Sequence, residues 1–262
     1  MGNWSDQIVS GLNRLADRLE ESGLWYTLMY GSLLGAVRGG DVIEWDYDFD
    51  ILMRPEDVSL LCSMKDRLAR DGLSLVDARL LHHRLPVNPG NVQESYIQSI
   101  DVNLNGEKVG DIYVFQLFND GILRRYDTEN GCFWWPHSSF PAWFVEGRET
   151  AMLRGRSFPT PRAPKKLIEG IYGEDWETPY KAPSQGGEYR EGRTYHSDLF
   201  MPKLVREIAW CEAQGWDRSK YRNELPWPQP IRGAGPWGFT ERTKDTTQAY
   251  WWNTLTELVA HY

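Results

Sequence analysis

Between positions 45 and 51 the chain alternates acidic residues with large apolar ones. The acidic members are Asp46, Asp48 and Asp50. Because successive side chains of a β-strand point to opposite faces, a strand over residues 42–53 puts all three carboxylates on one face. Such carboxylates repel one another, and burying an unpaired one is costly. A divalent cation that prefers oxygen ligands, such as Mg²⁺, would remove the conflict.

Two other interpretations of the acidic segment remain open, an exposed acidic edge strand and a calcium-binding loop. The segment lacks the glycine and the closing glutamate of an EF-hand loop. The metal-binding strand is therefore the favoured interpretation.

A phosphate-binding turn is predicted just upstream, where Gly31 and Ser32 follow the apolar run 25–30. We expect a short strand over that run and a short helix over residues 32–38. Backbone N–H groups at the start of such a helix can bind a phosphate. Ser32 could bond the phosphate or cap the helix. Arg38 could pair with a phosphate, or be a surface arginine favoured by the helix dipole.

The rest of the first half predicts alternating helices and strands. Apolar residues at helical spacing predict a helix over residues 4–22, and Pro55 opens another that ends at Asp71-Gly72. A strand is expected over residues 73–78. Asn105-Gly106 predicts an antiparallel hairpin of strands 97–104 and 108–117.

The second strand of this hairpin carries Asp111 among apolar residues. An acid in such a strand needs a partner, either a hydrogen bond or ion pair or a role as metal ligand or base. Asp101 on the first strand is a weaker candidate for the same role.

After residue 131 the chain becomes rich in aromatic residues, proline and glycine. The pattern predicts helices over residues 164–172, 199–212 and 246–262, and a loop over 181–194. We expect a catalytic domain over residues 1–180 and an aromatic-rich extension over 181–262 that packs on it. Most of the 13 tryptophans are assigned to the core, although a sugar- or cation-facing surface is the alternative.

The overall composition excludes some classes of function. A net charge of −8 disfavours a nucleic-acid surface. The three cysteines are widely spaced and suit no disulfide framework, so a reducing, cytoplasmic compartment is expected. We also expect no signal peptide and no transmembrane segment.

Three blocks of this sequence resemble the LicD family, which includes fukutin and fukutin-related protein. The first block joins residues 31–38 to 43–50, the second is Gly110-Asp111-Ile112-Tyr113, and the third spans residues 172–179. The resemblance implies an α/β (α+β) fold with a nucleotidyltransferase-like mixed sheet flanked by helices. It also implies transfer of phosphocholine or a polyol phosphate, such as ribitol phosphate, from a CDP-activated donor to a glycan hydroxyl.

The resemblance further assigns roles to the acidic residues. The metal-binding pair falls on Asp48 and Asp50, the third carboxylate on Asp111, and Asp46 becomes an additional acid. Mg²⁺ or Mn²⁺ is the implied cofactor. Asp111 could be a metal ligand or could take the proton from the attacking hydroxyl. Gly31, with Ser32 and Arg38, would contact the donor phosphate.

Two competing functions are compatible with the same residues. A true nucleotidyltransferase would use the same carboxylates but release pyrophosphate instead of CMP. A non-catalytic module could keep the fold and present its aromatic residues to glycans. The expected location is the cytoplasm or the cytoplasmic face of a membrane.

Overall fold

The computed structural model of this chain describes residues 4–76, 80–84, 92–97, 99–124, 139–181, 200–221 and 241–244. The predicted helix over residues 246–262 and nearly all of the predicted loop over 181–194 lie outside this part. Among the described helices, none is both long enough and apolar enough to cross a lipid bilayer.

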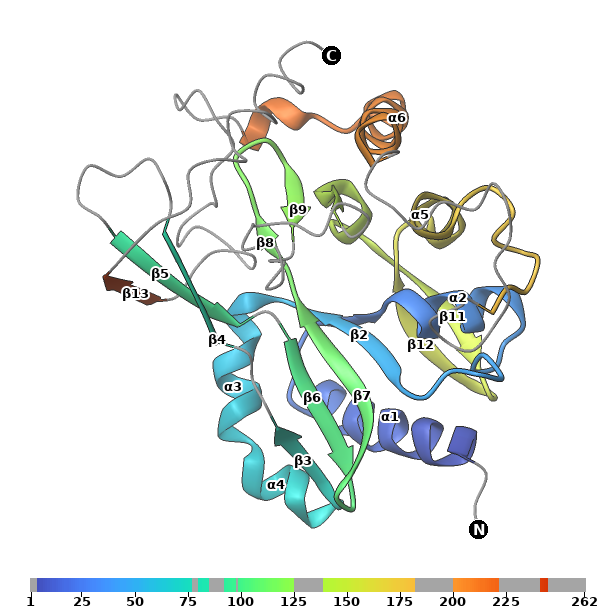
Figure 1. The fold of residues 1–262 in the computed structure, drawn as a ribbon, viewed down its shortest axis with the longest axis vertical. Coiled ribbons are helices and arrows are strands. Elements are labelled where there is room, and N and C mark those ends of the chain that lie inside the picture. Colours follow the sequence, from blue (N-terminus) through green and yellow to red (C-terminus); the bar gives the residue numbers. More distant parts are fainter. Residues whose placement is uncertain are drawn as a thin grey trace.

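A five-stranded mixed sheet forms the centre of the molecule, with the strand order β1-β2-β7-β6-β3 (Figure 1). The strands are β1 (Tyr26–Leu28), β2 (Phe49–Met53), β7 (Glu107–Val114), β6 (Ser99–Leu104) and β3 (Leu73–Val76). β2 and β7 are parallel, whereas the other neighbours are antiparallel. The mixed α/β fold expected from the resemblance is therefore confirmed.

Helix α1 (Trp4–Glu21) covers one face of this sheet and packs on β7, β6, β2 and β3 (Figure 1). Its apolar residues recur at helical spacing, and Ile8, Leu12, Leu15 and Leu19 are fully buried. Removing such side chains from water is the main driving force for this packing. The sequence prediction of a helix here is confirmed.

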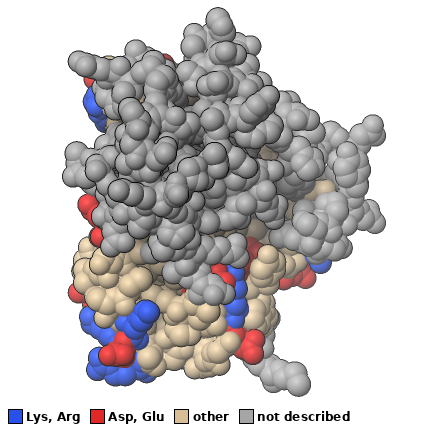
Figure 2. Space-filling model, turned by 60° about the vertical axis from the view of Figure 1, so that its left-hand side comes forward, with Lys and Arg blue, Asp and Glu red and all other residues tan. Residues whose placement is uncertain are grey.

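Short helices border the sheet at β3, where the turn η1 (Pro55–Asp57) leads into α3 (Val58–Ser63) and α4 (Lys65–Arg70). The sequence predicted one helix here, but it is interrupted at Met64. Figure 2 shows both signs of charge side by side at the lower end of the described surface. Ion pairs between α1 and the segment of α4 and the turn after it join Arg18 to Asp71 and Arg67 to Glu21.

Helix α2 (Tyr30–Arg38) packs on β2 and connects the central sheet to a second group of elements. That group contains the hairpin of β11 (Arg148–Leu153) and β12 (Arg156–Pro161) and the helix α5 (Pro164–Tyr172). β12 lies against β1, and both β11 and α5 lie against α2. The predicted helix over residues 164–172 is confirmed.

The remaining elements lie around α5 and above the sheet in Figure 1. They are β8 (Gln116–Leu117), β9 (Ile122–Arg124), β10 (Phe140–Pro141), η3 (Ala142–Val145), α6 (Phe200–Ala213) and η6 (Arg218–Tyr221). A separate three-stranded sheet contains β4 (Leu80–Arg84), β5 (Val92–Ile97) and β13 (Glu241–Lys244). Helix α6 confirms the prediction for residues 199–212.

A buried acid lies where α6 meets α5. Glu207 of α6 is 3% exposed, and its carboxylate lies so close to Gly170 of α5 that a Cβ there would collide with it. Lys203 Nζ is 3.8 Å from Glu207 Oε1. Burial raises the pKa of Glu207 to about 7. The glycine in the middle of α5 is thus explained by the close approach of α6.

One prediction about the acidic segment is wrong. The strand was expected over residues 42–53 but begins at Phe49, so residues 42–48 form turns and irregular backbone. β2 pairs with β7 from Phe49↔Gly110 onward. Residues before Phe49 would have to pair with Val109 and Lys108, where the β6–β7 pairing is irregular. The helix was predicted to begin at Ser32 and begins at Tyr30 instead.

Candidate active site

The two central strands bring Asp50 and Asp111 side by side. β2 and β7 are parallel, and their register pairs these two residues directly. Their neighbours Phe49 and Gly110 lie on the face toward α1, because a Cβ at Gly110 would collide with the Phe49 ring, which also approaches Gly11. Side chains alternate along each strand, so both carboxylates point to the opposite face.

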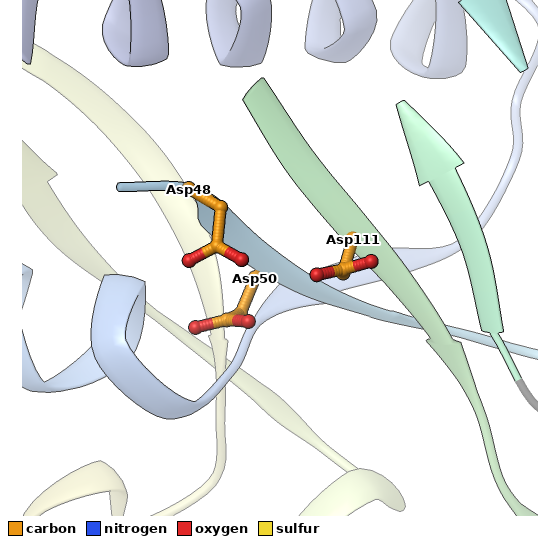
Figure 3. A group of neighbouring side chains, drawn as sticks. All are labelled: Asp48, Asp50 and Asp111. Atoms are coloured by element: carbon orange, nitrogen blue, oxygen red, sulfur yellow. The ribbon is translucent and has the colours of Figure 1, made fainter. Parts of the chain in front are cut away.

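Asp48 completes a group of three carboxylates although it precedes β2. One carboxylate oxygen from each of Asp48, Asp50 and Asp111 lies within 4.8 Å of the other two. Figure 3 shows the three carboxyl groups converging from the approach to β2, from β2 itself and from β7. Such a group of hard oxygen donors can hold a divalent cation of the size of Mg²⁺ or Mn²⁺.

The first turn of α2 is fastened to Asp50 by two hydrogen bonds. The Gly31 N–H donates to Asp50 Oδ2 at 2.9 Å, and the Asp50 N–H donates to Ser32 Oγ at 2.9 Å. Ser32 is 3% exposed. The backbone at Tyr30, where the helix begins, is left-handed with a φ of 41°. The predicted phosphate turn therefore lies against the carboxylates, and Ser32 joins α2 to β2.

Asp46 lies beside the group without being one of the three close carboxylates. A Cβ at Gly31 would collide with Asp46 Oδ2 and come within 3.2 Å of Asp50 Oδ2. The Tyr47 N–H donates to Asp46 Oδ1 at 3.2 Å. Glycine at position 31 is thus required by the approach of two carboxylates. The sequence grouped Asp46 with the metal ligands by strand alternation, and this alternation does not extend to residue 46.

Burial dominates the electrostatics of these acids. It raises the pKa of Asp46 to about 6, and it raises the pKa of Asp48 to about 6 with a further contribution from Asp46. The pKa of Asp50 is raised well above its ordinary range by burial and then by the charges of Asp48, Asp46 and Asp111. Burial also raises the pKa of Asp111. A bound cation would offset these penalties, so the residues present fit a divalent metal.

Two further residues border the group on the side of β6. Asp101 pairs in register with Asp111, and Lys108 Nζ lies 3.0 Å from Asp111 Oδ1 and 3.3 Å from Asp101 Oδ1. The sequence identified Asp101 as a weaker candidate but missed Lys108. Lys108 and Asp111 are three residues apart in a strand, a spacing that places side chains on opposite faces.

Arg38 lies away from the carboxylates, at the other end of α2 from Gly31. Seven residues of helix span about 10 Å. The Arg38 Nη1 donates to the carbonyl oxygen of Trp176 at 3.4 Å, which joins the first and third sequence blocks. The contact of Arg38 with a donor phosphate stays a prediction.

Comparison with known proteins places this site in a family. The family profile described as LicD/FKTN/FKRP, nucleotidyltransferase domain, matches residues 23–163, more than half of the chain. This protein belongs to the LicD family. The matched region contains the three carboxylates and the first turn of α2.

Two characterised relatives match a short stretch of this LicD-family chain. They are the ribitol 5-phosphate transferases FKRP of Mus musculus and of Homo sapiens, each 58% identical over 40 residues. The match covers 15% of this chain and 8% of each relative. The resemblance drawn from the sequence is confirmed, and this chain is a member of a family that includes phospho-alcohol transferases.

Proposed function

We propose that this protein transfers a phospho-alcohol, such as phosphocholine or a polyol phosphate, from a CDP-activated donor to a glycan hydroxyl. Asp48 and Asp50 would hold Mg²⁺ or Mn²⁺, and Asp111 would lie beside the ion as the base for the acceptor proton. The observation that carries the proposal is the convergence of these carboxylates at the first turn of α2, within a LicD-family domain. The FKRP relatives are named as ribitol 5-phosphate transferases, which supports this class of reaction.

The bond changes of the proposed reaction balance without a further reactant. The oxygen of the acceptor hydroxyl attacks the phosphorus atom that carries the alcohol. The bond from that phosphorus to the bridging oxygen breaks, and CMP leaves with the electron pair. The hydroxyl proton passes to a carboxylate, for which Asp111 is the candidate because it lies at the edge of the group next to Lys108. When bound, the cation would neutralise charge on the diphosphate.

Protein groups around the site fix the orientation of Asp50 and place a partial positive charge next to it. Asp50 is held by the Gly31 amide and by Ser32, so its carboxylate has little freedom to turn. The partial positive charge at the start of α2 faces the same point and favours bound phosphate. The Gly31 N–H already donates to Asp50 Oδ2, so our proposal for donor binding depends on the cation and on the partial charge of the helix start. Ser32 and Arg38 have the partners described above.

Incubation with a panel of donors tests this proposal. CDP-choline, CDP-ribitol and CDP-glycerol, each with Mg²⁺ and an oligosaccharide mixture, should show metal-dependent release of CMP for at least one donor. Asp48→Asn should abolish the release, whereas Asp66→Asn, which alters an exposed acid on α4, should not. Pyrophosphate release from CTP would instead show a nucleotidyltransferase. Glycan binding without turnover of any donor would show a binding module.

A further inference from the structure

The Lys108 side chain lies on the same face of β7 as Asp111, which a regular strand would not allow. On β7 it precedes Asp111 by three residues, and side chains at that spacing point to opposite faces of a strand. Even so, its Nζ lies 3.0 Å from Asp111 Oδ1. A local change in the strand must turn Lys108 toward the carboxylate face.

A β-bulge at Val109 produces this change. The pairing of β6 with β7 runs Val102↔Gly110 and then Asn103↔Lys108, so Val109 has no partner on β6. Val109 and Gly110 both face α1, because Val109 approaches Gly11 of α1 and Gly110 lies against Phe49. Two consecutive residues on one face shift the alternation by one position, so Lys108 joins the face of Asp111.

The bulge gives the Lys108 ammonium two carboxylate partners. Asp101 Oδ1 lies 3.3 Å from Nζ and Asp111 Oδ1 lies 3.0 Å away. Asp101 is paired in register with Asp111 on the neighbouring strand, so it holds the ammonium from the side opposite to Asp50. The Asp101 and Asp111 side chains are largely buried, whereas that of Lys108 is 41% exposed. Loss of the Lys108 charge would therefore change the site more than the core.

We propose that Lys108, anchored by Asp101, is a positioning residue that orients the Asp111 carboxylate toward Asp48 and Asp50 for proton transfer. The inference deepens the proposed function and rests on it. Lys108 is not assigned as a ligand of the donor phosphate, because its ammonium already contacts two carboxylates. The cation stays with Asp48 and Asp50 when Lys108 is changed.

Lys108→Gln separates this role from a structural one, because kcat should fall whereas the Mg²⁺ affinity should not. At saturating Mg²⁺ and donor, kcat should fall about 10–100-fold, as expected when a reacting group is misplaced by about 1 Å. The KM for the donor should stay within about threefold of wild type. Mg²⁺ affinity measured by calorimetry should be unchanged or tighter, because a positive charge beside the cation has been removed. Lys108→Arg should restore part of kcat.

Lys65→Gln serves as the matched control. Lys65 is an exposed lysine on α4, a helix that packs on the edge strand β3. Its kcat and Mg²⁺ affinity should equal those of wild type. An unchanged kcat in Lys108→Gln would overturn the proposal. A parallel fall in kcat and Mg²⁺ affinity would also overturn it and show a structural role. A rise in donor KM at constant kcat would identify a phosphate ligand instead.

A measurement without substrate keeps this inference separate from the proposed function. In metal-free protein, the urea midpoints of Lys108→Gln, Asp111→Asn and the double variant should be non-additive, because both single changes remove the same contact. Additive shifts would overturn the proposal, because they would show that Lys108 and Asp111 do not interact in the folded protein. If wild type released no CMP from any donor, the proposed function would fail, whereas the coupling between Lys108 and Asp111 would still be measurable.

Discussion

Replacing Ser32 with alanine tests how α2 is held against the site. The Ser32 Oγ accepts a hydrogen bond from the Asp50 N–H at 2.9 Å, and both residues are less than 10% exposed. Alanine would leave a buried amide without its acceptor, which costs about 1–3 kcal/mol. For a domain of this size each kcal/mol shifts the melting temperature by about 2–4 °C. We therefore expect Ser32→Ala to melt roughly 2–12 °C below wild type.

Thermal unfolding followed by circular dichroism measures this shift, with Ser63→Ala as the control. The Ser63 hydroxyl donates to the Leu60 carbonyl at 2.7 Å in an exposed position. Water can replace that bond, so the control should stay within about 0.5 kcal/mol of wild type. Calorimetry with Mg²⁺ adds a second readout. Ser32→Ala should bind the ion more weakly, because Asp50 loses one of its two fixed contacts with α2.

The outcomes distinguish phosphate binding by Ser32, one of the roles left open by the sequence, from the contact with Asp50 that the structure shows. A melting temperature equal to wild type would contradict this prediction, because the buried Asp50 amide would then have found another acceptor at no cost. Unchanged stability with weaker donor binding would show that the hydroxyl contacts phosphate. Alternatively, Ser32→Ala lowers the stability and weakens donor and Mg²⁺ binding by the same factor. That result would show that Ser32 acts through Asp50.

Three further predictions follow from packing and from buried acids. Gly110→Ala should destabilise the fold by about 1–3 kcal/mol in urea, because the new methyl group would collide with Phe49. Gly39→Ala should unfold like wild type, because a Cβ there would meet the Gly35 carbonyl oxygen at an ordinary contact distance of 4.0 Å. Burial raises the pKa of Glu207 to about 7, so the native state holds the extra proton between about pH 4.5 and 7 and stability falls as pH rises through that window. Glu207→Gln should remove that fall in urea titrations, and an identical pH profile would contradict the assignment. Burial also raises the pKa of Asp48 to about 6, so Mg²⁺ affinity measured by calorimetry should rise from about pH 5 to 7, by up to about tenfold per unit, whereas a flat profile would argue against its role as a ligand.

The sequence predicted those elements that depend on neighbouring residues. The helical spacing of apolar residues near the N-terminus predicted α1, and Asn105-Gly106 predicted the β6–β7 hairpin. Both turn residues have positive φ angles, 52° and 93°, a backbone conformation that asparagine and glycine tolerate. The three sequence blocks led to the resemblance to the LicD family, and the family profile confirms it.

The acidic segment shows where local pattern was insufficient. Alternation over residues 45–51 predicted a strand, but a strand needs a hydrogen-bonded neighbour along its length. β7 supplies that neighbour only from Gly110 onward, so Asp46 and Asp48 lie in irregular backbone. Asp48 still reaches Asp50 and Asp111, whereas Asp46 lies against Gly31 outside the close group.

The family and the approximate places of the described helices and of the hairpin could be read from the sequence, which also named Asp48, Asp50 and Asp111 as candidate ligands but added Asp46 to them. Three features could be seen in the folded chain alone: the parallel pairing of β7 with β2, the bulge at Val109 that turns Lys108 toward Asp111, and the close approach of Glu207 to Gly170. The reason is physical. Backbone preferences and side-chain periods are properties of adjacent residues, whereas strand order, bulges and close approaches depend on residues that are distant in the chain.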